Sequence, residues 1–361
     1  MVALFVIMVP LGFIAPGIHQ GHHYSIVIAA LAIMASMIRE GPVRWFLWYA
    51  ALWCVLVHLA AIIDPLGPTE LAKRAFGEVV FLLVGACIYV AAARSALKAD
   101  AIYNIICVSA LLQATIGLCQ LFGYFPFMDL LRLMATVEMP LPIGFSYGCI
   151  GTLVNPNFFA AYMAITIPFF MRGKWKWCLP LILGMLLIQE TSTAIIALGA
   201  GAIYYYRKWP VALGAVGAAL LFVLVFDLKI LTLESARFGY WLDLLRQIAG
   251  GSEDLAWLIG FGPGAFTGQM FPIHNDWLEL LYRYGIIGLG LGIAYTVGIL
   301  NRHRLLTTAL VIAAVNCLGN YPMRLAPSAI LIVVIMGLLE RETREDIACN
   351  CGADPCPGTI H

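Results

Sequence analysis

Apolar segments long enough to cross a membrane recur along almost the whole of this 361-residue chain. A membrane-spanning α-helix needs about 20 predominantly apolar residues, with a range of ~17–25. The chain is 62% hydrophobic and 11% charged, whereas a soluble domain carries about 25% charged residues. Because the apolar segments are spread over the full length, they do not correspond to one soluble core. The sequence therefore predicts an all-α integral membrane protein.

About twelve transmembrane helices are expected, with no internal repeat among them. They cover approximately residues 2–18, 24–38, 45–63, 75–93, 101–122, 158–171, 177–190, 192–206, 209–226, 277–299, 305–318 and 326–339. The segments between 158 and 206 are short, which favours tilted or kinked helices there. We expect residues 1–340 to form one polytopic membrane domain and residues 341–361 to form a tail.

The basic residues predict the orientation, because short cytoplasmic loops are enriched in Lys and Arg. With a cytoplasmic N-terminus, most of the 21 basic residues lie in cytoplasmic connections. These are Arg39, Arg44, Arg94, Lys98, Arg172, Lys174, Lys176, Arg207, Lys208, Arg302, Arg304, Arg341 and Arg344. Both termini are then cytoplasmic, and two long outer loops cover about 123–157 and 227–276. Long connections are frequent places for function.

The first outer loop ends in VNPNFF, where Asn155 is a suitable N-cap and Pro156 suits the first helical position. The helix that starts here has its N-terminal end, with a partial positive charge, on the outer side. Such an end favours anions. The alternative is a well-capped membrane helix with no ligand.

The second outer loop contains TLESARFGYWLDLLRQIAGG, which is expected to form an amphipathic helix at the membrane interface over about 235–249. The residues assigned to its apolar face are Phe238, Trp241, Leu242, Leu245 and Ile248. Arg237 and Arg246 flank this face. Arginine suits bidentate phosphate contacts, although outer arginines also anchor helix ends at lipid headgroups.

The same loop ends in the glycine-rich GFGPGAF turn and then HNDWLELLYRYG. Asp276 with Glu279 matches a capping pattern for the next helix. The positive end of that helix disfavours a charged imidazole, so His274 is expected to be neutral and able to accept a proton. The alternative for His274 is a capping or interfacial histidine. Glu279 and Arg283 have the spacing of an ordinary helix-surface pair.

Four segments together resemble the O-antigen ligase and polymerase superfamily of membrane glycosyltransferases. They are GTLVNPNFFAAYMAITIPF, SARFGYWLDLL, GFGPGAF and HNDWLELLYRYGIIGLGLG, in the order of the family and within about residues 148–295. The resemblance implies a multi-span enzyme that takes glycans from undecaprenyl diphosphate on the outer face of the bacterial inner membrane, without a metal or cofactor. Its partners would be this donor, a lipid or glycan acceptor and membrane lipids, with no nucleic acid.

By the same resemblance, His274 corresponds to the family's essential histidine, the base that deprotonates the acceptor hydroxyl. Arg237 corresponds to the outer-loop arginine that holds the donor diphosphate. The family's further arginine at a span start has no counterpart, because the chain reads QETSTAIIALG there. Arg283, Arg74 or Arg324 would then supply the second positive charge. The other expected substrate-binding residues are Asn155, Asn157, Asn275 and Tyr321.

The function expected first is ligation of the glycan to a lipid A–core hydroxyl. A polymerase that extends the glycan, or transfer to a protein hydroxyl, would use the same motifs. A small-anion transporter of the bicarbonate type is a further alternative. A transporter places polar or broken helices near the bilayer midplane, whereas the charges here collect at the outer ends of helices. A non-catalytic assembly partner is the last alternative.

Overall fold

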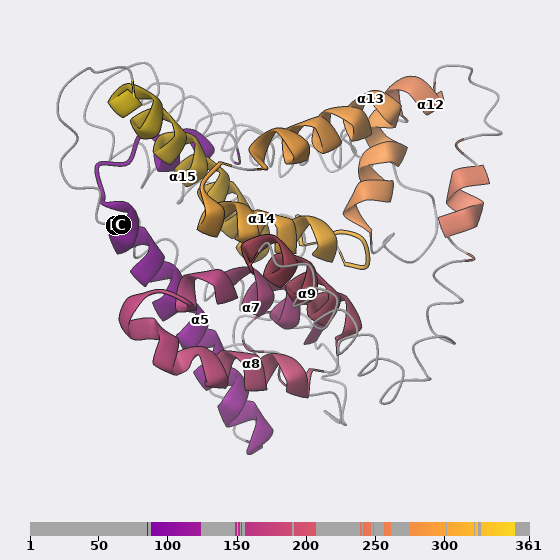
Figure 1. Ribbon diagram of the computed structural model, residues 1–361. Coiled ribbons are helices and arrows are strands. Elements are labelled where there is room, and N and C mark those ends of the chain that lie inside the picture. Colours follow the sequence, from indigo (N-terminus) through magenta and orange to yellow (C-terminus); the bar gives the residue numbers. More distant parts are fainter. Residues whose placement is uncertain are drawn as a thin grey trace, which may run out of the picture.

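The computed structural model describes residues 85, 88–123, 149, 151, 153, 156–189, 191–206, 239, 241–246, 248, 256–260, 275–300, 302–320, 322–323 and 326–350. Within these ranges the regular structure is helical and contains no strand, as expected (Figure 1). The expected spans 2–18, 24–38, 45–63 and 209–226 lie outside the described residues.

Helices occur at the positions where the sequence predicts apolar segments. They are α5 (Ala99–Leu121), α7 (Pro156–Phe170), η1 (Gly173–Cys178), α8 (Leu179–Ile188), α9 (Ser192–Tyr206), α12 (Ala256–Ile259), α13 (Asp276–Ile299), α14 (Arg304–Asn316) and α15 (Ala326–Asn350). Pro156 is the first residue of α7, as its fixed φ angle favours. The last helix continues to Asn350, through the first part of the segment expected to be a tail.

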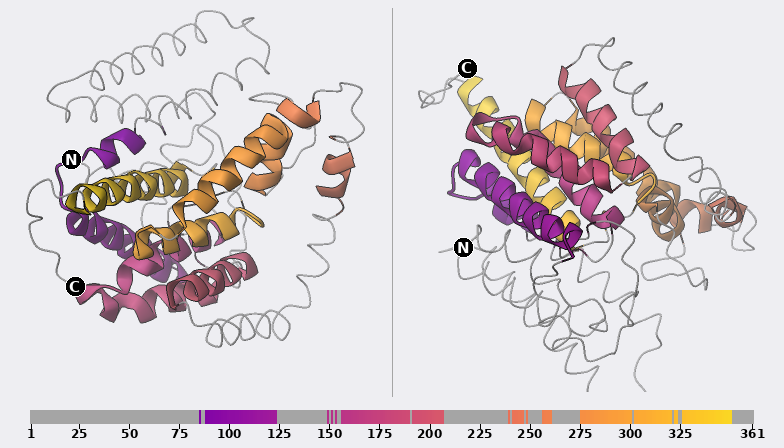
Figure 2. Two further views of the ribbon diagram at one scale, coloured as in Figure 1. Left: turned by 45° about the horizontal axis from the view of Figure 1, so that its top comes forward. Right: turned by 90° about the horizontal axis from the view of Figure 1, so that it is seen from below.

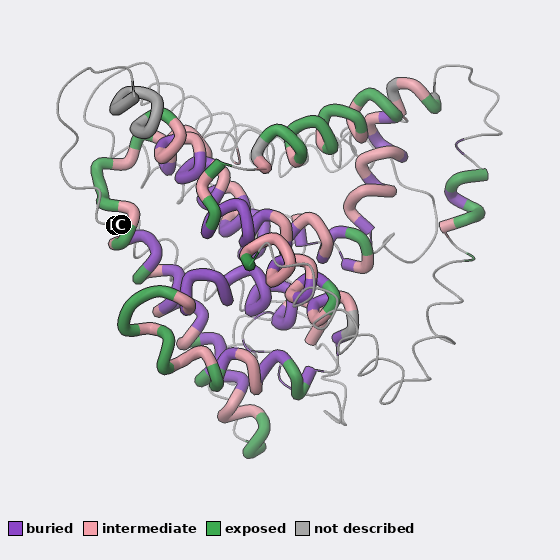
Figure 3. Tube along the Cα trace, in the orientation of Figure 1, coloured by how far each residue is buried: buried purple, intermediate pink, exposed green. Residues whose placement is uncertain are grey.

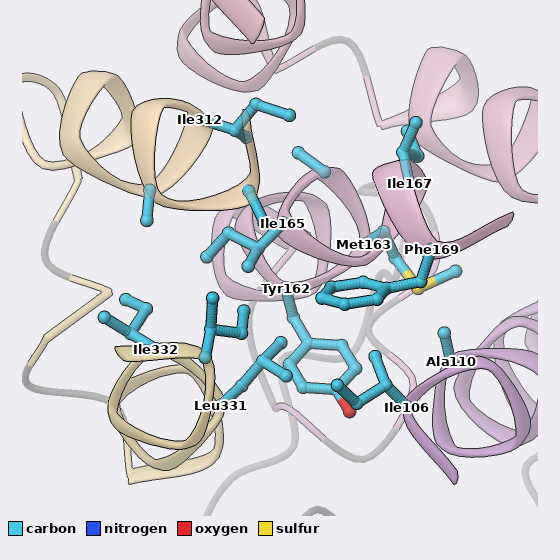
Figure 4. Packing of buried hydrophobic residues seen from close by; sticks show 14 of the residues in the cluster. Ile106, Ala110, Tyr162, Met163, Ile165, Ile167, Phe169, Ile312, Leu331 and Ile332 are labelled. Carbon is cyan, nitrogen blue, oxygen red and sulfur yellow. The ribbon is translucent and has the colours of Figure 1, made fainter. Parts of the chain in front are cut away.

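The core is organised around α7, whose side chains from Phe159 to Phe170 are all buried. It packs against α5, α8, α9, α14 and α15, and Figure 4 shows its aromatic rings between the aliphatic side chains of α5 and α15. Inside this core the hydroxyl groups of Ser109 and Tyr162 lie 2.7 Å apart. A helix buried on all sides is hydrophobic all round, which explains the uninterrupted apolar sequence of α7.

Two of the described helices are long and apolar enough to cross a membrane, namely α5 and residues Asp276–Gly298 of α13. The 23 residues of α5 correspond to about 34 Å, slightly more than the ~30 Å hydrocarbon core. The number of spans stays a prediction, since α7, α8, α9 and α14 are shorter.

Most of the second half of α13 is exposed, as the green colour of its tube shows in Figure 3, and many of its exposed residues are apolar. Its exposed members include Ile286 (50%), Leu291 (67%) and Val297 (59%). Only 17% of the apolar window of this helix is buried, compared with 56% for α5. Such a surface suits contact with lipid chains better than contact with water.

α13 is not one straight helix, although the sequence predicts a continuous span over 277–299. Gly285 interrupts it with φ 65° and ψ −166°, and the helix changes direction there (Figure 1). Both views of Figure 2 show α12 beside α13, on the far side of the bundle from α5. The break divides α13 into a first half that packs against other elements and an exposed second half.

Described basic residues are concentrated at one end of the helix bundle, which we call the basic end. Its members are Arg94, Lys98, Arg172, Lys174, Lys176, Arg302, Arg304, Arg341 and Arg344. Contacts join the helix ends there: Arg341 donates to the carbonyl of Leu97 (2.8 Å), and Arg304 lies over the ring of Tyr205 (4.8 Å). All of these residues belong to the connections expected on the cytoplasmic side; the side itself stays a prediction.

Candidate functional site

Three of the residues expected at the site are described, namely Asn157, Asn275 and Arg283. The others lie outside the described residues: His274, Arg237, Asn155, Arg74, Arg324 and Tyr321. Four of these are adjacent in sequence to described residues. Pro156 directly follows Asn155, Asn275 directly follows His274, Tyr321 lies between Asn320 and Pro322, and Met323 directly precedes Arg324.

Asn275 caps the N-terminus of α13 and is only 5% exposed. Its side-chain oxygen accepts a hydrogen bond from the N–H of Leu278 (3.0 Å), and its side-chain nitrogen donates to the carbonyl of Leu318 (2.8 Å). The expectation that Asp276 is the cap is wrong by one position. An N-cap needs an extended backbone, which Asn275 has (φ −155°, ψ 106°), whereas Asp276 is already helical. Asn275 therefore fixes the backbone that directly follows His274.

Asp276 connects the start of α13 to the turn after α14. Its N–H donates to the carbonyl of Cys317 (3.0 Å), and its carboxylate accepts from the N–H of Met323 (2.9 Å). The indole N–H of Trp277 donates to the carbonyl of Ala314 (2.9 Å). The turn that leads to Arg324 is thereby held against the helix that begins beside His274.

Glu279 and Arg283 form an ion pair close to the break in α13. Arg283 Nη2 lies 2.8 Å from Glu279 Oε1, and the side chains are 8% and 10% exposed for the arginine and the glutamate. The expectation of a helix-surface pair is wrong, because this half of α13 packs against other elements instead of facing solvent. The guanidinium charge is largely balanced by the carboxylate. Arg283 is thus a weaker source of free positive charge for a diphosphate than the sequence indicates.

The glycine-rich turn and the YGIIG stretch meet backbone to backbone at Gly260 and Gly285. Both residues have positive φ angles, 76° and 65°. A Cβ atom on Gly260 would lie 2.2 Å from the carbonyl carbon of Arg283, and one on Gly285 would lie 2.2 Å from the carbonyl oxygen of Leu258. Only glycine satisfies both the backbone angle and this approach. The first residue of the glycine-rich motif therefore packs directly against the break in α13.

The helical segment around 241–248 of the second outer loop also packs on the first half of α13. Leu244 and Ile248 are buried in one cluster with Tyr282 of α13, and Trp241 packs against them. Two residues assigned to the apolar face, Leu242 (44%) and Leu245 (38%), are exposed, as a face turned to the bilayer would be, and Phe238 lies outside the described residues.

The buried face of this segment follows positions 241, 244 and 248, which share one side of a helix. The exposed leucines leave a second apolar face for another contact, such as the bilayer surface. Arg246 pairs with Asp243 at 3.0 Å, and both side chains are exposed. The expected amphipathic helix is thus present in part, with a different face turned inward.

The first outer loop is held by Gln120 at the end of α5. Its side-chain amide donates to the carbonyl of Gly151 (2.8 Å) and accepts from the N–H of Gly151 (2.9 Å). Gly151 has a φ angle of 56°, and a Cβ atom there would lie 2.5 Å from Gln113 Oε1 and 2.8 Å from a ring carbon of Phe159. Glycine at position 151, the first residue of the GTLVNPNFFAAYMAITIPF segment, is therefore required by both backbone angle and space.

Asn157 lies at the start of α7 and contacts the start of α9. The hydroxyl of Thr191 donates to Asn157 Oδ1 at 3.4 Å. Nearby in the loop, Cys149 is fully buried, and burial raises the pKa of its thiol. The apolar surroundings thus make Cys149 a poor nucleophile and favour a packing role.

A series of contacts connects the starts of α7, α9 and α13. Asn157 contacts Thr191 ahead of α9, Thr193 of α9 lies against Gly319, and Asn275 binds the neighbouring carbonyl of Leu318. We call this group of helix ends the polar end. Sequence reasoning does not single out Thr191, Thr193 or Gly319. The one feature of the sequence that points to these residues is their position next to the ends of expected transmembrane spans.

The polar end brings the N-termini of α7, α9 and α13 together, beside the C-terminal ends of α5, α8 and α14. A helix N-terminus is a position at which an anionic group can bind. Comparisons of the chain with models of protein families, with curated proteins and with solved structures find no match. The interpretation of the site therefore depends on its residues and geometry.

Proposed function

We propose that this protein is a membrane glycosyltransferase of the O-antigen ligase type. It would move a glycan from undecaprenyl diphosphate to an acceptor hydroxyl, such as that of lipid A–core, on the periplasmic face of a bacterial inner membrane. The observation that carries the proposal is the packing around the first half of α13. The loop segment that follows Arg237, the first residue of the glycine-rich turn (Gly260) and the residue after His274 all meet on this one element.

In the proposed reaction, His274 takes the proton from the acceptor hydroxyl as its oxygen attacks the anomeric carbon of the donor. The bond between this carbon and the diphosphate oxygen breaks, and undecaprenyl diphosphate leaves. The single displacement inverts the configuration. Positive groups near the leaving oxygens stabilise their developing charge. Arg237 and the helix N-termini of the polar end supply this stabilisation, and Arg74 or Arg324 is the candidate for the second charge.

The ion pair of Arg283 with Glu279 supports a positioning role for Arg283 in this mechanism. The pair would keep the first half of α13 in place, and with it the cap formed by Asn275. A base must be within hydrogen-bond reach of the proton that it removes, so a displaced cap would lower the transfer rate without changing His274 itself. The exposed apolar half of α13 and the exposed leucines of the loop segment are candidate surfaces for the lipid chain.

The experiment compares glycan transfer by His274→Ala and Arg237→Ala with transfer by the parent protein in cells that lack the native gene. Both variants are expected to abolish transfer while membrane insertion is retained. Matched controls are Arg246→Ala, which alters an exposed arginine of the same loop, and His303→Asn, which keeps a side-chain acceptor for the N–H of Leu306. Undiminished transfer by His274→Ala would exclude the assignment.

The material that accumulates distinguishes the two enzyme alternatives. Loss of a ligase leaves full-length polymer on its carrier lipid, whereas loss of a polymerase leaves single repeat units. A transporter of small anions would instead lose anion uptake, with unchanged glycan products.

A further inference from the structure

The short connection between α7 and α8 differs from the rest of the basic end, because it alternates basic and aromatic residues. We call residues 172–177 (RGKWKW) the basic–aromatic turn. Trp177 is 80% exposed, and Lys174 and Lys176 are exposed beside it. An exposed tryptophan next to lysines in a chain with apolar helices is typical of the bilayer–water interface.

The basic–aromatic turn is held in a fixed position by contacts with α5. The indole N–H of Trp175 donates to the side-chain oxygen of Asn104. The guanidinium of Arg172 lies 3.8 Å from Asp100 Oδ1 and 5.6 Å from the ring centroid of Tyr103. The turn is therefore tied to the core, while Lys174, Lys176 and Trp177 remain exposed. Lys174 Nζ lies 5.1 Å from the ring centroid of Trp175, and Lys176 Nζ lies 5.5 Å from that of Trp177.

An apolar face of α8 continues from the exposed tryptophan. Trp177, Leu181, Gly184 and Ile188 follow one another at the spacing of a single helix face. Leu181 and Ile188 are 37% and 47% exposed. No atom lies within 4 Å of the place where a Cβ on Gly184 would be, so no other element covers this face of α8 at that position. A surface with charge at one end and apolar side chains along its length matches an amphiphile.

We propose that this surface binds an acidic phospholipid of the bilayer, with the headgroup at Lys174 and Lys176 and an acyl chain along α8. The positive charge of the two lysines complements the negative charge of the headgroup phosphate. It therefore favours binding of an acidic lipid over a zwitterionic one. Trp177 lies at the level between headgroup and chain, where tryptophan is enriched. The proposal rests on the membrane location of the protein and not on the glycosyl transfer reaction.

The test measures lipid binding to the full-length protein in detergent by native mass spectrometry, with phosphatidylglycerol and phosphatidylcholine as probes. Each lysine near a membrane surface contributes about 1 kcal/mol of attraction, so Lys174→Gln/Lys176→Gln should weaken phosphatidylglycerol binding about thirtyfold in Kd. The control, Arg94→Gln/Lys98→Gln, removes two charges from the same end outside the turn and should leave binding unchanged. Trp177→Ala, at an exposed position, should also weaken binding.

Two further measurements complete the test, and the first of them distinguishes a lipid headgroup from free phosphate as the ligand. Inorganic phosphate should fail to displace phosphatidylglycerol, because it lacks the acyl chain that occupies α8. Equal binding of the two lipids, unchanged binding by the double lysine variant, or displacement by free phosphate would each overturn the proposal. Glycan transfer by the same variants is measured in parallel, so that loss of lipid binding is distinguished from loss of the proposed reaction.

Discussion

Gly260 and Gly285 form a backbone contact between two separate motifs. Both the backbone angles and the surrounding atoms restrict these two positions to glycine. Each has a positive φ angle, which costs a residue with a Cβ atom roughly 1–2 kcal/mol. Each also lies against backbone atoms, which cannot move aside as a flexible side chain can. The contact fixes where α12 lies relative to the break in α13, and hence where the loop that precedes His274 begins and ends.

Gly285→Ala is expected to lower the free energy of unfolding by more than ~2 kcal/mol, because a steric overlap adds to the backbone strain. Glycan transfer should fall with it. The control is Gly290→Ala in the same helix, where nothing lies within 4 Å of the added Cβ. Denaturant titration in detergent measures both. An effect of Gly285→Ala no larger than that of the control would refute the close backbone contact.

Gly151→Ala tests the first outer loop in the same way. Gly151 and Gly123 both have positive φ angles, but the surroundings of Gly123 are open while those of Gly151 contain Gln113 and Phe159. Both substitutions carry the cost of the backbone angle, so the difference between them isolates the overlap. We expect Gly151→Ala to be more destabilising by about 1–3 kcal/mol. Equal unfolding free energies for the two variants would show that the loop is not packed as described.

At the scale of elements, the buried pair of Glu279 and Arg283 makes the first half of α13 dependent on both charges. Removing one partner of a buried ion pair leaves an uncompensated charge and costs about 3–5 kcal/mol. Replacing both partners removes that uncompensated charge. The pair is close to the Gly285 break and to Tyr282, which packs on the outer-loop segment. Its loss should therefore affect the site as well as stability.

A double-mutant cycle tests this expectation. Glu279→Gln and Arg283→Met alone should each be strongly destabilising, while the double variant should be much less destabilised than the sum of the two. The exposed pair Arg246–Asp243 provides the comparison, with a coupling of about 0.2–1 kcal/mol. Unfolding free energies in detergent give the couplings. Additive effects at Glu279 and Arg283 would contradict the buried pair.

The sequence predicts where the described helices lie, but it does not predict which half or face of a helix is buried. Hydrophobic runs indicate α5, α7, α9 and α14 because a long apolar segment has few other structures available in a membrane. The break at Gly285 was not predicted, since a glycine within an apolar run is compatible with a continuous helix. Its φ angle follows from the contact with Gly260, which the sequence alone does not reveal.

Segments of the candidate site were predicted from the sequence, but the contacts between these segments were not. The cap was expected at Asp276 because the spacing to Glu279 suits a capping box, and the two carboxylates instead bind Met323 and Arg283. Partners from distant segments override such local patterns. For the same reason the packing of Trp241, Leu244 and Ile248 on α13 was not predicted, since the spacing does not say which face meets α13.

At the scale of the whole molecule, the helices separate two chemically different ends. Basic side chains are concentrated at one end, and helix N-termini with amide and hydroxyl side chains form the polar end. α5 connects the two: Lys98 precedes it at the basic end, and Gln120 in its last turn binds Gly151 of the first outer loop. If the bundle crosses a membrane with the orientation that its charges predict, these two ends face opposite compartments.

Cysteine labelling at the two ends of α5 tests this arrangement. Lys98 and Phe122 are exposed, Phe122 by 82%, so Lys98→Cys and Phe122→Cys should be tolerated. In intact cells with a permeable outer membrane, an impermeant maleimide should label Phe122→Cys and not Lys98→Cys, above the level of the parent protein. Cys149 should add little to that level, because a buried thiol with a raised pKa is seldom present as thiolate. Permeabilising the inner membrane should then expose Lys98→Cys.

Labelling of both positions from the same side would exclude α5 as a membrane span. Labelling with the sides exchanged would place the polar end, and the proposed transfer reaction, in the cytoplasm.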